Sequence, residues 1–592
     1  MSALALMRPL FAAFLLGSVL CGGAVAQSAS RAGAPLPELP SEYPDRLELK
    51  LAEGSGAEWR DGALRSRTGV DLSAVAALLR GFEVRPMVTA VSRERLDAWH
   101  AHACAVQPAH NRPGHLGLWF CVRGDDADAV ASLRERLAAE PLVEHVYHEP
   151  VIYPASFGAA LPPGGDPAPP TPSFTAMQLE HGPTPIGHGT RFAAGILGAR
   201  GQGVGFRMIE HSWIWGHEDL CQVVATNVIG AAPVFTAPEA NHGIAGASIA
   251  FGDRNAWGVT GVADEVGAKF LAIYPNGGFA NAVALALANS QPGDVAMAVV
   301  MVLVSSFGPG SWLPVEFLQA AFDATLTATS NGLHFVVPAG NGNRNLDDPA
   351  LLGRFDRNFR DSGAIMVAAS AAGALQRAAF SNYGSRIDAH SWGDQVVAAG
   401  YGTLFFGNND PLQSYTAAAT GTSSATPHVA GIVAALQGAA RRQLGQSLSN
   451  QEILDLLHTV GPTTPDVIGR RPDLEAMLRQ LGVIDGLTMA EPDVARGGTI
   501  VADLEGPIGS IAALFAAYQT ADVPLGYNRN IHLDLGQLVA VGAFVLGAGT
   551  AQYQLAVPNT AVLQDLDIYY QAVRVDPNQL LYVTNSCQVT IL

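Results

Sequence analysis

The sequence predicts an α/β protein whose central part is a doubly wound, mainly parallel sheet. Between about 200 and 480, strand-length apolar runs alternate with helical stretches, the pattern of a sheet covered by helices on both faces. Before this region, a helical stretch followed by an alternating segment indicates a small α+β unit. After it, short alternating stretches indicate a β-sandwich.

The first residues have the features of an export signal. Residues 1–26 combine an early arginine, an apolar run from 10 to 20 and a small-residue cleavage site. The run is too short to span a bilayer, so the protein is predicted to be secreted or periplasmic. Cys21 offers the alternative of a lipoprotein anchor, although Leu20 before it is bulkier than such processing normally accepts.

The N-terminal unit is indicated by residues 126–151. Leu133 and Leu137 have helical spacing, and VEHVYHEPV then alternates as a short edge strand does. Residues 156–175 are so rich in Pro and Gly that they are predicted to form an exposed linker.

Composition argues against some functions. The 592-residue chain has a formal net charge of −18, whereas a nucleic-acid binder needs clustered basic residues. Export would permit disulfides, and Cys104 could pair with Cys121. For Cys221 and Cys587, a disulfide and buried free thiols both fit the sequence. No Cys-x-x-Cys metal spacing is present.

The central region should contain several buried parallel strands and the helices between them. The expected strands are 205–209, 267–275, 295–304, 332–339 and 363–370. One helix is expected over 279–290, and a second from Pro314 to Gly332. Ligands of such a domain bind at the carboxyl ends of the strands.

The most specific functional motif is GTSSATPHVAGIVAAL, which begins at Gly421. A Ser at the start of an apolar helix lies among unpaired backbone N–H groups, which favour a developing oxyanion. The motif resembles the nucleophile motif of the subtilisin-like serine peptidases, the subtilases, which makes Ser423 the expected nucleophile. The alternative is an ordinary helix cap at Ser423. The resemblance extends over about 200–480.

A subtilase implies an acid and a His upstream, in the order acid, His, Ser. His188 lies in GHGTRFAAG and His242 in ANHGIAGAS, but only His242 follows the candidate acid strand. The resemblance therefore assigns the base to His242, and His188 is predicted to lie in a surface loop. Ile244 and Ser248 replace the family's usual Thr and Gly.

The segment GVGFRMIEHSWIWGHEDL resembles the family's acid strand and places Glu210 where an Asp is usual. A Glu carries the same charge on one more methylene, so it can still orient the imidazole. Asp219 is the rival acid and is expected to be structural, and His211 is expected to point to the opposite face of the strand. Two interpretations of the sequence remain open: an active peptidase, and a non-catalytic binding protein on the same scaffold. The presence of both Ser423 and His242 favours the active peptidase.

Two further features follow from the resemblance. The strand before Asn341 ends in the family's A-G-N, which implies an oxyanion donor there, with a plain Asn-Gly turn as the alternative. Ser306, Phe307 and Gly308 resemble the segment that pairs with an extended peptide substrate. No cofactor or metal site is predicted with certainty, but residues 346–349 could contribute to a structural calcium site.

Taken with the resemblance, the sequence predicts a secreted serine endopeptidase that forms an acyl-enzyme with protein or peptide substrates. Residues 27–155 are expected to be an inhibitory prodomain, 176–485 a subtilisin-like peptidase domain and 486–592 a C-terminal β domain. Neither a nucleic-acid partner nor a membrane span is expected.

Overall fold

The structure is a computed structural model that describes residues 42–154, 171–233, 236–274, 276–524 and 529–592. The predicted export signal and most of the predicted linker lie outside the described residues. None of the described helices has the length and apolar character that a bilayer span requires.

The N-terminal unit, residues 42–154, is a four-stranded antiparallel sheet with helices. The strand order is β4-β5-β1-β6, so β6 lies at an edge as predicted. Helix α3 begins after Asp126, whose side chain caps it, and buries Leu133 and Leu137. The strands are β1 (Glu42–Leu51), β2 (Ala57–Arg60), β3 (Ala63–Ser66), β4 (Glu83–Pro86), β5 (Trp119–Arg123), β6 (Val143–Pro150) and β7 (Ile152–Pro154); the helices are α1 (Ser73–Leu78), α2 (Arg93–Val106) and α3 (Ala127–Ala138).

The central region is built on a six-stranded parallel sheet in the order β15-β14-β13-β10-β8-β9. Each of the five predicted segments contributes a strand to this sheet, and the doubly wound α/β class is confirmed. The strands are β8 (Gly205–Glu210), β9 (Gly267–Ala272), β10 (Val295–Ala298), β13 (His334–Pro338), β14 (Ile365–Ser370) and β15 (Ala389–Trp392).

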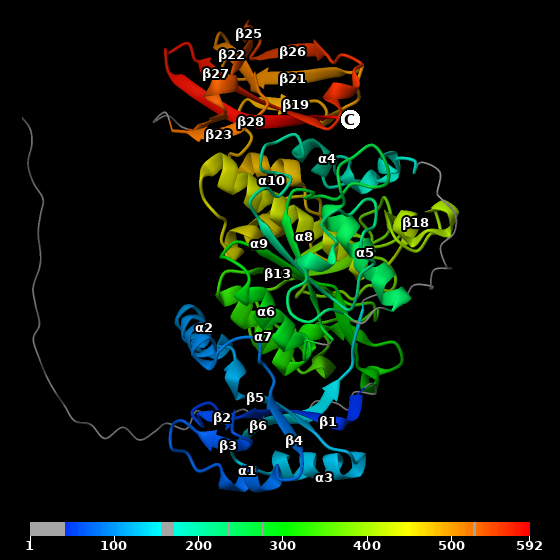
Figure 1. Ribbon diagram of the computed structural model, residues 1–592. Coiled ribbons are helices and arrows are strands. Elements are labelled where there is room, and N and C mark those ends of the chain that lie inside the picture. Colours follow the sequence, from blue (N-terminus) through cyan, green and yellow to red (C-terminus); the bar gives the residue numbers. More distant parts are fainter. Residues whose placement is uncertain (1–41, 155–170, 234–235, 275, 525–528) are drawn as a thin grey trace, which may run out of the picture. The chain divides into compact units, whose positions relative to one another are not determined.

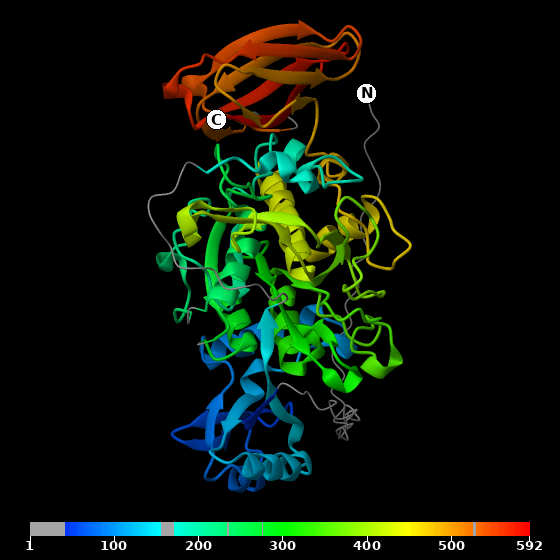
Figure 2. The same cartoon turned by 90° about the vertical axis from the view of Figure 1, so that its right-hand side faces the viewer.

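Helix α8 lies in the interior of this region in both views (Figures 1 and 2). All of its side chains are buried, in keeping with a sequence that is apolar on every side. The other helices are α4 (Thr190–Ala193), α5 (Ala237–Phe251), α6 (Phe279–Ala288), α7 (Gln319–Ser330), α9 (Asn450–Thr459) and α10 (Leu474–Gln480), and α8 itself spans Thr422–Ala439. A small antiparallel sheet contains β16 (Val396–Ala399), β17 (Phe405–Phe406) and β18 (Ser414–Ala419).

Two predicted boundaries were wrong. Helix α7 begins at Gln319, because Pro314 ends the short strand β12 (Trp312–Pro314) and a 3-10 turn follows it. The run 295–304 is not one strand. Its first half is β10 of the parallel sheet, whereas β11 (Val300–Leu303) pairs antiparallel with β12 and with β7 of the N-terminal unit.

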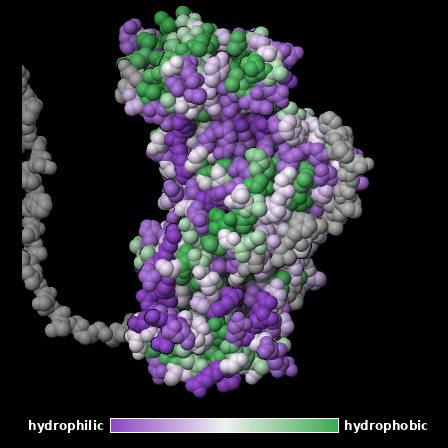
Figure 3. Space-filling view, in the orientation of Figure 1, coloured by the Kyte–Doolittle hydropathy of each residue, from purple (hydrophilic) through white to green (hydrophobic). Residues whose placement is uncertain are grey.

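The C-terminal region contains a five-stranded sheet, β20-β28-β27-β22-β25, and a three-stranded sheet, β19-β21-β26. Buried and exposed residues alternate along β21 and β22, which is typical of a two-layer sandwich. Figure 3 shows apolar surface over this region, where Ile511 and its cross-strand partner Val545 are both exposed. The strands are β19 (Leu487–Met489), β20 (Asp493–Val494), β21 (Thr499–Glu505), β22 (Ile511–Ala517), β23 (Thr520–Val523), β24 (Ile531–Leu533), β25 (Val539–Val545), β26 (Thr550–Ala556), β27 (Leu566–Val575) and β28 (Leu581–Ile591).

The cysteines among the described residues are all free. Cys104 and Cys121 do not form the disulfide considered from the sequence, and burial raises the pKa of Cys121 to about 12. Cys587 is a buried thiol, whereas Cys221 is exposed and its thiol donates to Asp253.

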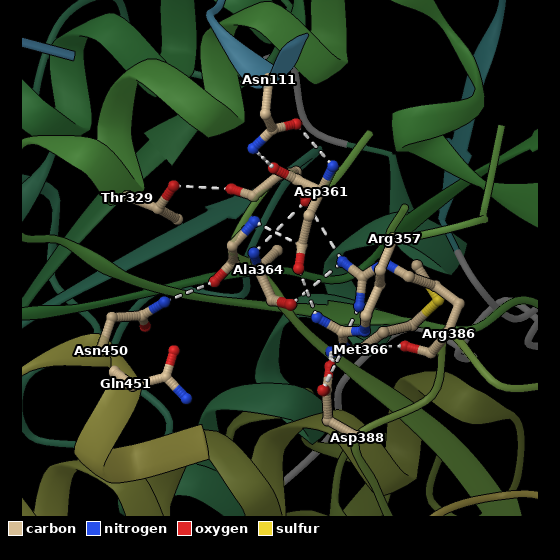
Figure 4. A network of polar contacts seen from close by, with 12 residues as sticks. Asn111, Thr329, Arg357, Asp361, Ala364, Met366, Arg386, Asp388, Asn450 and Gln451 are labelled. Carbon is tan, nitrogen blue, oxygen red and sulfur yellow. Dashed lines mark hydrogen bonds and ion pairs between the residues drawn. The ribbon is translucent and has the colours of Figure 1, made fainter. Parts of the chain in front are cut away.

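A buried ionic network supports the edge of the parallel sheet near β15 (Figure 4). The guanidinium of Arg386 donates to Glu316 at 2.9 Å and to Asp388 at 3.0 Å, and all three side chains are almost fully buried. Asp388 also accepts from the backbone N–H of Met366 in β14. Because buried charges are tolerated only when they are paired, each member depends on the others.

Replacing Arg386 by Met should destabilise the protein by about 3–5 kcal/mol, because Glu316 would stay buried without its cation. Thermal unfolding would measure the loss as a lower Tm. Arg479→Met is the matched control, because Arg479 pairs with Glu475 at the surface and such pairs contribute less than about 1 kcal/mol. Equal shifts in the two variants would contradict the assigned role.

Candidate active site

A buried acid–imidazole pair lies at the carboxyl edge of the parallel sheet. Glu210 is the last residue of β8, and its Oε2 lies 2.7 Å from Nδ1 of His242 in α5. Glu210 is fully buried and His242 is 4% exposed. Burial opposes the charge of Glu210, but the imidazoles of His242 and His211 outweigh this effect and lower the pKa of Glu210 to about 2.

His211 is the second partner of this carboxylate, and the prediction that it points away was wrong. Its Nδ1 lies 3.0 Å from Oε1 of Glu210, and its backbone N–H donates to the same oxygen at 2.8 Å. Strand β8 ends at Glu210, so strand alternation no longer governs the next side chain. Nε2 of His211 lies 3.0 Å from the carbonyl oxygen of Ile152 in β7.

Both ring nitrogens of His211 therefore face oxygen acceptors, which is the environment of an imidazolium. Burial opposes that charge, but the hydrogen bond and the charge of Glu210 outweigh it and raise the pKa of His211. The Glu210 carboxylate thus lies between two imidazoles, and His211 connects it to the N-terminal unit.

Helix α5 departs from the subtilase pattern at Ile244 and Ser248, and the surrounding structure accommodates both residues. The carbonyl of Ser212 lies where a Cβ on Gly243 would be, so this position requires Gly. Ile244 is fully buried in the core. The hydroxyl of Ser248 donates to the Ala245 carbonyl and accepts from the N–H of Ala399 in β16, at 2.9 Å each.

Helices α5 and α8 pack side by side in the same direction. A Cβ on Gly246 would lie 3.8 Å from Cγ of Pro427, and a Cβ on Gly431 would lie 3.1 Å from the carbonyl oxygen of Ala250. Residues four apart share one face of a helix. The residues one turn before Gly246 and Pro427 are His242 and Ser423, so this packing directs the base and the expected nucleophile toward each other.

Ser423 lies in the first turn of α8, where it is 4% exposed. Gly421 before it has φ +117°, a conformation that favours Gly. The side-chain oxygen of Asn341 accepts from the N–H and from the hydroxyl of Thr422, at 2.9 Å each. Asn341 is thereby fixed beside the start of α8, and its amide nitrogen is the donor end of the side chain.

The rival candidates have other partners. Asp219 accepts from Asn255 at 2.8 Å and from the N–H of Val259 at 2.6 Å, so it holds a loop together. His188 was predicted in a surface loop, and this was wrong because it is fully buried. Its ring nitrogens lie 3.0 Å from the Pro472 carbonyl oxygen and 2.7 Å from the Ser391 hydroxyl.

Residues 306–308, which were predicted to pair with an extended substrate, do not form a strand in the structure. Ser305–Phe307 form a 3-10 turn that precedes Gly308. Pairing with an extended segment occurs earlier, where Val302, Met301 and Val300 of β11 face Ile152, Tyr153 and Pro154 of β7. No separate signal for this pairing exists in the sequence, since the whole apolar run fits a buried strand. A substrate role for Ser306, Phe307 and Gly308 stays a prediction.

The acidic residues considered for calcium each serve a local turn. The carboxylate of Asp347 accepts from the N–H and the hydroxyl of Ser385, and that of Asp348 accepts from the N–H of Ala350. Calcium binding at residues 346–349 stays an untested prediction.

The parallel sheet thus carries a buried carboxylate paired with an imidazole, and the helix of that imidazole packs against a second helix that begins near Ser423. Residues 226–467 match the family model described as "Subtilase family". The match confirms the resemblance to the subtilases found in the sequence. Glu210 lies before the matched residues.

Several known proteins are similar over shorter stretches. "Subtilisin-like protease 3" of Trichophyton equinum is 30% identical over 148 residues, which is 25% of this chain and 30% of that protein. "Extracellular protease" of Xanthomonas campestris pv. campestris is 36% identical over 113 residues, 19% of this chain and 17% of that protein. Both matches thus span less than a third of the relative's own length. A solved cold-adapted subtilisin-like serine proteinase is 22% identical, with a TM-score of 0.33, over 46% of this chain and 88% of that chain.

Glu210→Gln should make the stability less sensitive to acid. The pKa of Glu210 is about 2 in the folded protein against an ordinary 4.5, so its charge stabilises the fold above pH 4.5. That contribution, about 3 kcal/mol, is lost as the pH falls through the folded-state pKa. Thermal unfolding in a Ser423→Ala background, at neutral pH and just above pH 2, would compare the variants.

When the pH is lowered, the Tm of the parent should drop more than the Tm of Glu210→Gln. Glu135→Gln is the control, because Glu135 is exposed on α3 and should leave the acid sensitivity unchanged. The same acid sensitivity in the parent and in Glu210→Gln would show that the carboxylate is not held ionised by its two imidazoles.

Proposed function

We propose that the protein is a secreted serine endopeptidase that cleaves peptide bonds in proteins or peptides. One observation carries this proposal. Glu210 pairs with the buried His242, and the helix of His242 packs in parallel with the helix of Ser423. Export is supported by the features of residues 1–26 and by the name of one similar protein, "Extracellular protease".

In the proposed reaction Ser423 attacks the peptide carbonyl while His242 takes its proton and then gives it to the leaving amine. Glu210 contacts Nδ1, which keeps the proton on that nitrogen and leaves Nε2 as the base. Its negative charge also stabilises the imidazolium that forms. The extra methylene of Glu, compared with Asp, carries the carboxylate from the end of β8 to the ring.

Stabilisation of the oxyanion is assigned to two donors at the start of α8. One is the backbone N–H at Ser423, which lies in the first turn, where N–H groups lack helical partners. The other is the amide of Asn341, whose oxygen end is held by Thr422. Fixed donors of this kind lower the barrier because they need no reorganisation during the reaction.

Three substitutions test the triad. Ser423→Ala should abolish casein hydrolysis, and Glu210→Gln should reduce kcat by roughly 10⁴-fold, because the imidazole loses its orienting charge. Glu210→Asp should reduce kcat by roughly tenfold to hundredfold, because the shorter side chain cannot maintain the 2.7 Å contact. Labelling by a fluorophosphonate would report activation of Ser423 independently of substrate choice.

If fully processed wild type resists the phosphonate and is no better than Ser423→Ala, the chain is a non-catalytic binding protein on this scaffold. That alternative is favoured by Glu in the place of the usual Asp.

We further propose that the N-terminal unit is an intramolecular inhibitor. The N–H groups of Thr89 and Ala90 donate to Asn281 of α6, at 2.9 and 3.0 Å. The indole of Trp119 donates to Asp323 of α7 at 3.1 Å. Strand β7 adds to β11 as an extended peptide would, which supports the idea that it occupies the substrate position.

A fragment of residues 27–154 should bind the mature Ser423→Ala protein at least tenfold more tightly than a fragment of residues 27–150. The shorter fragment lacks β7 and hence the pairing with β11. His211→Phe in the mature protein should weaken the longer fragment about tenfold, because the bond to the Ile152 carbonyl is lost.

The same substitution should leave binding of the shorter fragment unchanged. Calorimetry would give all four affinities, which form a double-mutant cycle. Equal binding of the two fragments would contradict a role for β7 in inhibition.

A further inference from the structure

A second cluster of titratable side chains is buried apart from the triad. Glu180 and His181 belong to the 3-10 turn η4 (Leu179–His181), and His428 lies on α8. One ligand atom from each residue lies within 4.8 Å of the others. The three residues are 1%, 7% and 1% exposed, so bulk water cannot solvate them.

Two of these side chains have no hydrogen-bond partner among the described residues. Both carboxylate oxygens of Glu180 and both ring nitrogens of His428 are buried and unpartnered. Their nearest approach is 3.7 Å, from Nε2 of His428 to Oε1 of Glu180, which is longer than a hydrogen bond. Buried carboxylates and imidazoles are normally hydrogen-bonded or metal-bound, and a group bound between Glu180 and His428 would satisfy both.

The third side chain is held in place by its neighbours. Nδ1 of His181 lies 2.8 Å from the hydroxyl of Thr190, the kind of outer contact that orients a metal-binding His. Nε2 of His181 lies 3.4 Å from the side-chain nitrogen of Gln178, which is longer than a typical hydrogen bond and leaves this nitrogen as the candidate ligand.

We propose that Glu180, His181 and His428 bind a zinc ion. Two imidazole nitrogens and one carboxylate oxygen are a typical ligand set for Zn²⁺, whereas Ca²⁺ prefers oxygen ligands alone. The cation compensates the buried negative charge of Glu180, and a water completes the four-coordinate shell. The ion joins the turn η4 to the helix that carries Ser423.

The ligand set stops at these three residues. The ring of His188 lies close to that of His428, with centroids 5.7 Å apart, but the Pro472 carbonyl and the Ser391 hydroxyl already occupy its nitrogens. The site lies apart from the nucleophile, because His428 follows Ser423 by five residues, which is about 7.5 Å along the helix and about 140° around it. The ion thus holds α8 in place without contacting the nucleophile.

The test is the metal content of the full secreted chain carrying Ser423→Ala, expressed with added zinc and then dialysed. Mass spectrometry should find about one zinc per chain, and Glu180→Gln should lose at least nine-tenths of it. Glu180→Gln keeps the side-chain size and lies on a turn, so it is the decisive variant, with folding checked by circular dichroism. His102→Gln, at an exposed position of α2, should retain the full content.

Two further readouts do not depend on peptidase activity. Removing the ion with a chelator should lower the Tm of the Ser423→Ala protein, and zinc should restore it, while the Tm of Glu180→Gln should not respond. Cobalt added in place of zinc should give the visible absorption of a four-coordinate site. The proposal is overturned if the folded protein retains no zinc, or if Glu180→Gln retains as much as its parent.

Discussion

The site depends on one buried carboxylate. Glu210 has no exposed surface, so its charge is tolerated only because His242 and His211 meet its two oxygens. The need to bring two imidazoles to Glu210 explains the local structure on either side of it. Strand β8 ends at Glu210, which lets the next side chain turn back, and the absence of a Cβ at Gly243 lets α5 approach the Ser212 carbonyl. The proposed catalytic geometry therefore follows from the pairing of a single charge.

His211 also links the Glu210 carboxylate to the N-terminal unit. It contacts the triad carboxylate through one ring nitrogen and the β7 carbonyl of Ile152 through the other. A peptide that leaves or replaces β7 would change the environment of His211, and hence the charge balance at Glu210. One side chain thus contacts both the Glu210 carboxylate and the strand that lies in the proposed substrate position.

The same electrostatic rule distinguishes the three buried glutamates among the described residues. Glu210 has two imidazoles, and Glu316 has the guanidinium of Arg386. Glu180 is equally buried, but no described residue hydrogen-bonds to its oxygens. The proposed zinc ion would give Glu180 the same kind of positive partner that the other two have.

The sequence by itself determined the features that local patterns encode. Alternating apolar runs predicted the parallel sheet, the helix around Ser423 was recognisable from its motif, and chain order favoured His242 over His188. Tertiary structure alone decided the direction of His211, the burial of His188, the division of 295–304 into β10 and β11, and the meeting of His181 with His428. Periodicity and spacing describe a residue's own element, whereas these features depend on how segments far apart in the chain pack together.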